Sequence, residues 1–146
     1  LLNLIKKIEG DLKIKIINSE KKYDDALVSK NVEIVNYVNQ NDSIIDVYDD
    51  NNIFILPSFT EAHPQVLDES LARLRPVIIF PEISHVKRDR EGIFISERNA
   101  NALEEVIKYI MKNYLNIQKK MMKNNLPTKR VFLSEISNII RNEKQK

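Results

Sequence analysis

Two kinds of hydrophobic pattern follow one another along the chain. Short runs rich in Ile, Val and Phe are typical of strands, whereas apolar residues three or four positions apart are typical of amphipathic helices. The strands predicted in this way lie at residues 12–17, 32–38, 53–56, 77–80 and 93–95. The predicted helices are one that ends near Gly10 and others at 19–30, 42–48, 64–74 and 99–114, with two more stretches, 115–124 and 130–142, separated by Pro127.

Strands that alternate with helices at this spacing indicate βαβ units, which build a mainly parallel sheet covered by helices. We therefore expect an α/β fold with a Rossmann-like parallel sheet flanked by helices. The chain opens inside a helix and residue 1 is Leu rather than Met. We interpret residues 1–146 as a single domain cut from a longer chain, in which residues 115–146 form a C-terminal helical tail.

Composition sets limits on the function. The 146 residues are 42% hydrophobic and 30% charged, which fits one soluble globular domain. There are no cysteines, which excludes disulfides, thiol catalysis and cysteine-bound zinc. No targeting segment and no membrane-spanning run is recognisable, so the expected location is the cytoplasm.

Charge is divided unevenly along the chain. Residues 1–110 carry 14 basic and 19 acidic side chains, a net charge of −5, whereas residues 111–146 carry 9 and 2, a net charge of +7. A basic end favours binding to anionic lipid or nucleic acid. The alternative interpretation is that these charges lie on the solvated faces of amphipathic helices, and we rank this interpretation higher. We expect no nucleic-acid partner, and we keep peripheral contact with the inner face of a membrane open.

The candidate site is the loop PSFTEAHP at residues 57–64, which follows a wholly apolar predicted strand and leads into a helix. In open α/β sheets, ligands bind beyond the carboxyl ends of strands, and a helix N-terminus suits a phosphate. Glu61 lies in the loop and Glu69 in the helix, so both carboxylates are placed to accept hydrogen bonds from sugar or ribose hydroxyls. As alternatives, a Glu near a helix start is also a capping device, and His63 is a candidate cap.

The frame around the two glutamates resembles the donor-site segment of group 1 (family 4-like) glycosyltransferases, which are retaining enzymes with two facing Rossmann-like domains, the GT-B fold. The shared order is an apolar strand, Pro57-Ser58, Glu61, Glu69 after seven intervening residues, a helix rich in small residues and a Pro-Val-Ile strand from Pro76. The segment EGIFISERNANALEEVIKYI fits the next part of the pattern, and the resemblance covers roughly residues 12–114.

The resemblance implies that this chain is the C-terminal, donor-binding half of a GT-B enzyme. Glu61 would then be the catalytic residue at the donor sugar, and Glu69 would hydrogen-bond the ribose. Val38 would border the base of the nucleotide. The sugar and pyrophosphate would be held by the backbone from residue 62 to residue 66, that is by Ala62, His63, Pro64, Gln65 and Val66.

Such enzymes need no metal or other cofactor, and the sequence holds only two histidines and no metal-ligand cluster. Lys87, Arg88 and Arg90 are interpreted as a solvated loop, and so are Asp49 and Asp50. The chain departs from the family pattern at Ala62 and Leu74, where Gly is usual, and at residues 81–86, where a Gly-rich loop is usual.

The expected function is transfer of a sugar from a nucleoside-diphosphate donor to a saccharide or lipid-linked acceptor, as in polysaccharide biosynthesis. The partners are the nucleotide sugar and an N-terminal acceptor domain that carries the basic pair for the pyrophosphate, so this part alone is expected to be inactive. Two alternatives are a GT-B-like sugar-nucleotide epimerase and a non-catalytic Rossmann-like binding module.

Overall fold

The structure is a computed structural model that describes residues 13–18, 32–36 and 44–143. The helices expected before Gly10 and at 19–30 lie outside these residues, and so does Val38. The elements in chain order are β1 (Ile14–Asn18), β2 (Val32–Asn36), α2 (Ile44–Asp49), β3 (Phe54–Ile55), α3 (Gln65–Ala72), β4 (Val77–Ile79), the 3₁₀ segment η2 (Pro81–Lys87), β5 (Ile93–Ile95), α4 (Ala100–Met121) and α5 (Lys129–Glu143).

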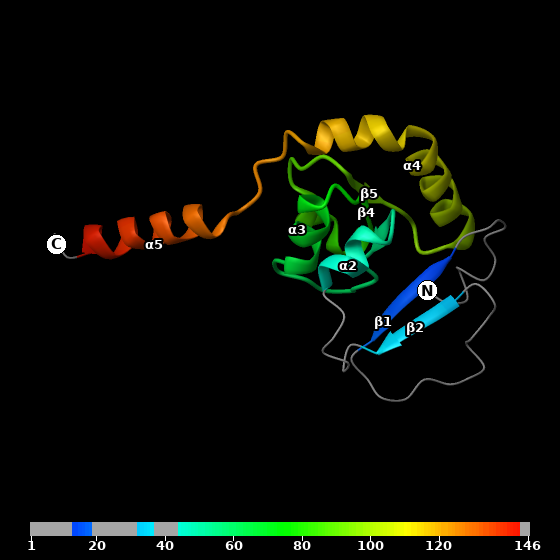
Figure 1. Cartoon of the computed structure of the whole chain (residues 1–146), viewed down its shortest axis with the longest axis horizontal. Coiled ribbons are helices and arrows are strands. Elements are labelled where there is room, and N and C mark those ends of the chain that lie inside the picture. The colour runs from blue at the N-terminus through cyan, green and yellow to red at the C-terminus, as the bar shows by residue number, and fades with distance from the viewer. Residues whose placement is uncertain (1–12, 19–31, 37–43, 144–146) are drawn as a thin grey trace.

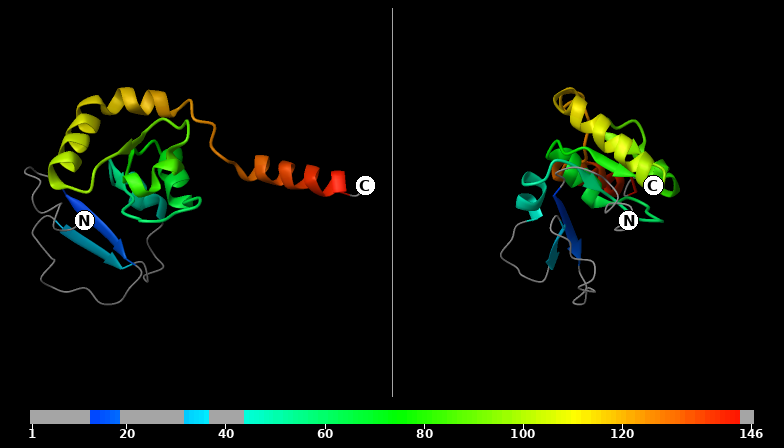
Figure 2. Two further views of the ribbon diagram at one scale, coloured as in Figure 1. Left: turned by 180° about the vertical axis from the view of Figure 1, so that it is seen from behind. Right: turned by 90° about the vertical axis from the view of Figure 1, so that its right-hand side faces the viewer.

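All strand pairs in the described residues are parallel, which confirms the α/β, Rossmann-like fold class. β3, β4 and β5 form one sheet in that order, with Phe54 beside Val77 and Val77 beside Ile93. β1 and β2 pair separately, with Ile14 beside Val32. α2 and α3 lie on one side of the three-stranded sheet and α4 arches over the other (Figures 1 and 2).

The core is centred on β4, which lies between two neighbouring strands. Val77, Ile78 and Ile79 are fully buried, because both edges of β4 are paired and both faces are covered. The strand predicted at 53–56 is wholly apolar in sequence, which is typical of a strand buried on both faces, but it is not the most buried strand. β3 is only half-buried, because it lies at one edge of the described three-stranded sheet.

α4 is longer than its sequence pattern suggested. We predicted a helix ending near Tyr114 and a second one from 115, but a single helix of 22 residues runs to Met121. The apolar spacing continues through Tyr114, Ile117 and Met121, and no Gly or Pro interrupts it before Pro127. Asn99 caps the start, as expected, by accepting a hydrogen bond from the Ala102 amide at 2.9 Å.

α5 extends away from the rest of the molecule (Figure 1). Its side chains Val131, Leu133 and Ile136 are 46%, 51% and 37% exposed. The boundaries of α5 agree with the helix predicted at 130–142 to within a residue. Thr128 Oγ1 accepts a hydrogen bond from the Val131 amide at 3.2 Å and so caps the first turn.

Candidate functional site

The loop at residues 57–64 leaves the carboxyl end of β3 and enters α3 at Gln65. Pro64 is the N-cap residue and no side chain caps the helix, because Pro64 has no polar side chain. The alternative in which His63 caps α3 is therefore wrong. His63 Nε2 instead lies 3.0 Å from Oδ2 of Asp68, in the first turn of α3.

Glu61 is held by contacts on both its side chain and its backbone. The Ser58 hydroxyl donates a hydrogen bond to Glu61 Oε1 at 2.6 Å. His85 Nε2, from η2, lies 2.8 Å from the Glu61 carbonyl oxygen and donates to it in the tautomer that carries the proton on Nε2. The carboxylate is thus oriented by the loop itself, while the backbone is tied to η2.

Arg98 fixes the first part of the same loop from the segment after β5. Its guanidinium donates hydrogen bonds to the carbonyl oxygens of Pro57, at 3.1 Å, and Ser58, at 2.8 Å. The guanidinium carbon lies 3.9 Å from the ring centroid of Phe59 and 4.2 Å from that of Phe80, which are cation–π distances. Arg98 therefore joins the loop to the buried end of β4.

Arg98 also forms an ion pair with Glu82 of η2, with Nε and Oε1 2.8 Å apart. This side-chain hydrogen bond, assisted by a backbone hydrogen bond at Glu82, lowers the pKa of the Glu82 carboxyl from its ordinary value of 4.5. The residues at 81–86, where the sequence departs from the family pattern, are therefore the support of the Glu61 loop.

Glu69 is oriented from α2. The Tyr48 hydroxyl, in a side chain only 5% exposed, donates a hydrogen bond to Glu69 Oε2 at 3.1 Å and lies 3.2 Å from the Val66 carbonyl oxygen. Arg75 donates to the Tyr48 carbonyl oxygen at 2.9 Å. Glu69 as a residue is exposed to solvent, although its hydrogen bond with Tyr48 is partly buried.

A cavity of about 630 Å³ opens beside Glu69. β1 forms one wall from Lys13 to Ile17 and β3 forms the other, with Tyr48 and Val66 at its side. Of the residues predicted for the donor site, Val66 and Glu69 line this cavity. The other described ones, Glu61, Ala62, His63, Pro64 and Gln65, belong to the loop and the start of α3 and do not line it.

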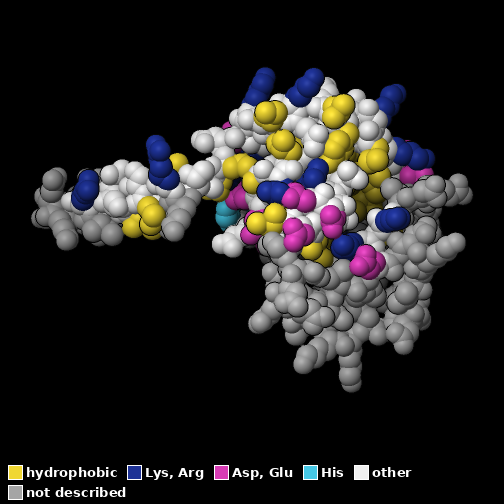
Figure 3. All heavy atoms as spheres, viewed as in Figure 1, with side chains coloured by type: hydrophobic (Ala, Val, Ile, Leu, Met, Phe, Trp, Pro, Cys, Tyr) yellow, Lys and Arg dark blue, Asp and Glu magenta, His cyan; other side chains and the backbone are white. Residues whose placement is uncertain are grey.

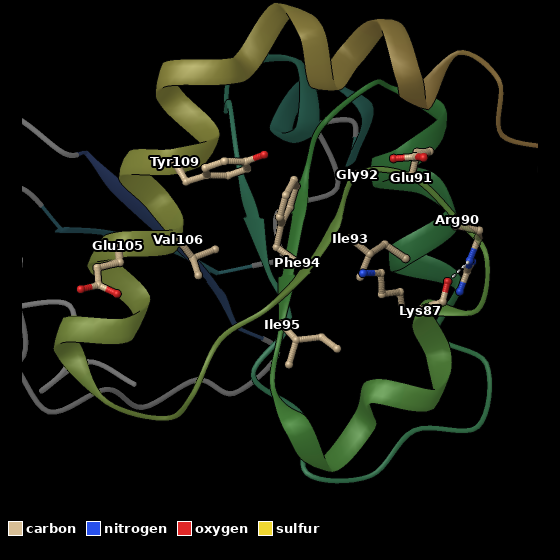
Figure 4. A pocket seen from close by; sticks show the side chains of 10 residues that line it. All are labelled: Lys87, Arg90, Glu91, Gly92, Ile93, Phe94, Ile95, Glu105, Val106 and Tyr109. Carbon is tan, nitrogen blue, oxygen red and sulfur yellow. Dashed lines mark hydrogen bonds between the residues drawn. The ribbon is translucent and has the colours of Figure 1, made fainter.

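A second cavity of about 530 Å³ lies along β5, the other edge of the described sheet, and contains none of the predicted site residues (Figure 4). Phe94 and Tyr109 meet there edge to face, with ring centroids 5.9 Å apart. Arg90 borders it and pairs with Asp68, which also holds His63. Arg90 is therefore not part of a solvated loop, because its side chain is only 11% exposed.

Asp49 was interpreted as part of a solvated loop, and its side chain is indeed 38% exposed, but it has partners and belongs to a helix. It ends α2 and forms ion pairs with Arg73 and Arg75, which lie just after α3. The hydrogen bond from Arg73 lowers the pKa of the Asp49 carboxyl, and the same contact raises the pKa of Arg73. These contacts fix α2 against the end of α3, and so they also fix Tyr48 beside Glu69.

Within the described residues, no cluster of three or more His, Asp or Glu side chains is arranged to hold a metal ion. In the same part of the chain, no helix combines the length and the hydropathy that crossing a membrane would require.

The parallel strands, with a polar loop and a helix N-terminus at the carboxyl end of β3, define a Rossmann-like α/β domain. The family model described as glycosyl transferases group 1 matches residues 11–127, most of the chain, so the protein belongs to this family. No curated protein and no solved structure gave a significant match.

Apart from Ser58, the residues that orient the two glutamates carry no motif in the sequence. Tyr48 and Arg98 are 21 and 40 positions from Glu69 and Ser58, and their side chains meet these partners only in the folded chain. The one local signal was Ser58, three positions before Glu61, which the Pro-Ser motif already contained.

Proposed function

We propose that this protein is the donor-binding domain of a retaining glycosyltransferase that moves a hexose from a nucleoside-diphosphate sugar to a saccharide or lipid-linked acceptor. The observation that carries the proposal is the position of Glu61. A carboxylate oriented by Ser58 lies in the loop that leads into α3, whose first turn has no side-chain cap. Hydroxyl groups and phosphate are the ligands that such a pair of features suits.

The two glutamates take different parts of the donor. Glu61 accepts hydrogen bonds from hydroxyls of the transferred sugar. The backbone around Ala62, His63 and Gln65 holds the pyrophosphate, with its charge at the positive end of α3. Glu69 accepts hydrogen bonds from the ribose, and we assign the nucleoside to the cavity of about 630 Å³ that Glu69 and Val66 line.

Catalysis in this arrangement rests on the diphosphate as leaving group and on positive charge that develops at the sugar carbon. Dipoles and hydrogen-bond donors that are already oriented stabilise these charges, and no metal is required by the proposal. An N-terminal domain supplies the acceptor site and the basic pair that neutralises the pyrophosphate. The enzyme works in the cytoplasm at the inner face of a membrane, where a lipid-linked acceptor is located.

Calorimetric titration with UDP-, GDP- and ADP-glucose, and with the matching nucleoside diphosphates, tests the assignment. Glu61→Gln should weaken binding of one nucleotide sugar about tenfold and leave the diphosphate unaffected, because one hydrogen bond between a carboxylate and a sugar is lost. Glu69→Gln should weaken binding of both the nucleotide sugar and the nucleoside diphosphate. Glu105→Gln, an exposed change on α4, is the matched control.

Turnover is measured in the enzyme that contains both domains, where Glu61→Ala should abolish most of it. Near-normal turnover of this variant would overturn the assignment of Glu61. So would a Glu61→Gln variant whose affinities for the nucleotide sugar and for the diphosphate fall equally. Failure of all three nucleotide sugars to bind the wild-type domain or the two-domain enzyme would favour a non-catalytic module.

A further inference from the structure

The two sides of α4 differ sharply. One side packs into the core through buried residues such as Leu103, Ile110 and Met121. The opposite side, continued by the C-cap and the next turn, is formed by seven residues at helical spacing, which we call the α4 outer face: Lys108, Met111, Lys112, Leu115, Lys119, Met122 and Lys123.

The hydrophobic residues of the α4 outer face are unusually exposed. Met111 is 50% exposed, and Leu115 and Met122 are 73% and 72% exposed. Lysines stand before, between and after them along the helix. In Figure 3, basic side chains project from α4 at the top of the molecule, with hydrophobic ones between them.

Acidic residues are missing from a long stretch around this face. The sequence has no Asp or Glu between Glu105 and Glu135, a stretch that contains seven Lys and Arg residues. Lys108 forms an ion pair with Glu104, at the start of this stretch. The remaining lysines of the face give it a net positive charge, which complements an anionic surface.

The face is also held in one orientation. Gln118 donates a hydrogen bond to the Leu74 carbonyl oxygen at 3.1 Å, and Tyr114 donates to that of Asn52 at 2.9 Å. Asn124 exchanges two hydrogen bonds of 2.9 Å with the backbone of Glu91. A binding partner therefore meets a surface that is already ordered.

We propose that the α4 outer face docks on an anionic lipid bilayer, with Met111, Leu115 and Met122 in the headgroup region and the lysines beside lipid phosphates. Interfacial helices of this kind combine apolar and basic residues and lie in the membrane plane. Nucleic acid fits less well, because the seven residues include no Arg for bidentate phosphate contacts and no aromatic ring for stacking. The inference deepens the membrane-face location proposed above and rests on that part alone.

Co-sedimentation with vesicles tests this surface, using phosphatidylcholine alone and a 7:3 mixture with phosphatidylglycerol. Wild type should bind the anionic vesicles only, and less at 0.5 M NaCl. Lys112→Gln/Lys119→Gln should lower partitioning on the order of tenfold, since each lysine contributes near an anionic surface. Leu115→Ser/Met122→Ser should lower it as well, with an unchanged midpoint of thermal unfolding.

The matched control lies on α5, which also carries exposed apolar and basic residues. Arg130→Gln/Leu133→Ser should bind anionic vesicles like wild type.

Two vesicle results would overturn the proposal. One is that the wild type does not bind anionic vesicles, and the other is that the α5 variant loses binding while the α4 variants keep it. The proposal would also be overturned if the wild type bound a labelled 20-nucleotide RNA but no vesicles, and if the α4 variants lost this RNA binding. Donor titration of the α4 variants keeps the two proposals separate, because it should match wild type whatever the vesicles show.

Discussion

The hydroxyl of Tyr48 donates a hydrogen bond to Oε2 of Glu69, 3.1 Å away. Tyr48→Phe should keep the edge-to-face contact with Phe54, whose ring centroid is 5.8 Å distant, and lose only the hydroxyl. We expect the free energy of unfolding to fall by about 1–2 kcal/mol, and nucleotide binding to weaken less than in Glu69→Gln. Denaturant unfolding and calorimetry measure the two effects.

A double-mutant cycle of Tyr48→Phe and Glu69→Gln separates orientation of the carboxylate from a general loss of packing. If Tyr48 acts through Glu69, it should have little further effect on nucleotide binding once Glu69 is Gln. Fully additive losses would contradict this relationship.

Arg98→Lys tests the support of the loop at residues 57–64. A lysine keeps the positive charge but lacks the planar fork that reaches two carbonyl oxygens and Glu82 together. The amides of Leu56 and Leu67, which flank this loop and donate to the carbonyl oxygens of Ile78 and Pro64, should exchange with deuterium about tenfold faster, which corresponds to about 1.4 kcal/mol of lost local protection. Exchange of these two amides should be unchanged in Arg130→Lys, a control in the exposed part of α5, and unchanged exchange in Arg98→Lys would refute the role of Arg98.

Glu82 makes the same support sensitive to acid. Because Arg98 lowers the pKa of Glu82 in the folded chain, the unfolded chain binds this proton more tightly. The contribution to stability is therefore present above the ordinary value of 4.5 and is lost as pH falls through the lower, folded pKa. The stability difference between wild type and Glu82→Gln should shrink between pH 6 and pH 3, and a constant difference would contradict the assignment.

Gly92→Ala tests a close contact below β5. Gly92 has a φ of +87°, and a Cβ atom there would lie 2.5 Å from Cγ of the buried Met121. We expect a loss of about 2–4 kcal/mol in the free energy of unfolding, from backbone strain and overpacking together. Combining Gly92→Ala with Met121→Ala should remove the overpacking and leave the backbone strain. The loss in the free energy of unfolding of the double variant should therefore be smaller than the sum of the losses of the two single variants.

The sequence was informative where a signal is local. The period of apolar residues predicted α3, β4 and β5 to within a few residues, and Asn99 marked the start of α4 correctly. It does not show which strand is central, because the apolar run at 53–56 is as hydrophobic as the one at 77–80. Only the pairing of β4 on both edges distinguishes them.

The contacts that orient the site carried no such signal. The ion pair of Arg90 with Asp68 joins residues 22 positions apart. From sequence alone, a charged residue in a loop is interpreted as solvated, because its partner is identified only in the folded chain. Leu74 is a partial exception. Its φ of +56° lies in the left-handed region after α3, which explains why the family usually has Gly there.

Both histidines of the chain lie at the loop that carries Glu61, since His63 contacts Asp68 and His85 contacts the Glu61 carbonyl oxygen. A proton NMR spectrum of the imidazole rings of this chain will therefore contain signals from these two residues alone. The loop at residues 57–64 thus has one spectroscopic probe within it and one in contact with it, and its response to an added nucleotide sugar can be followed without any label.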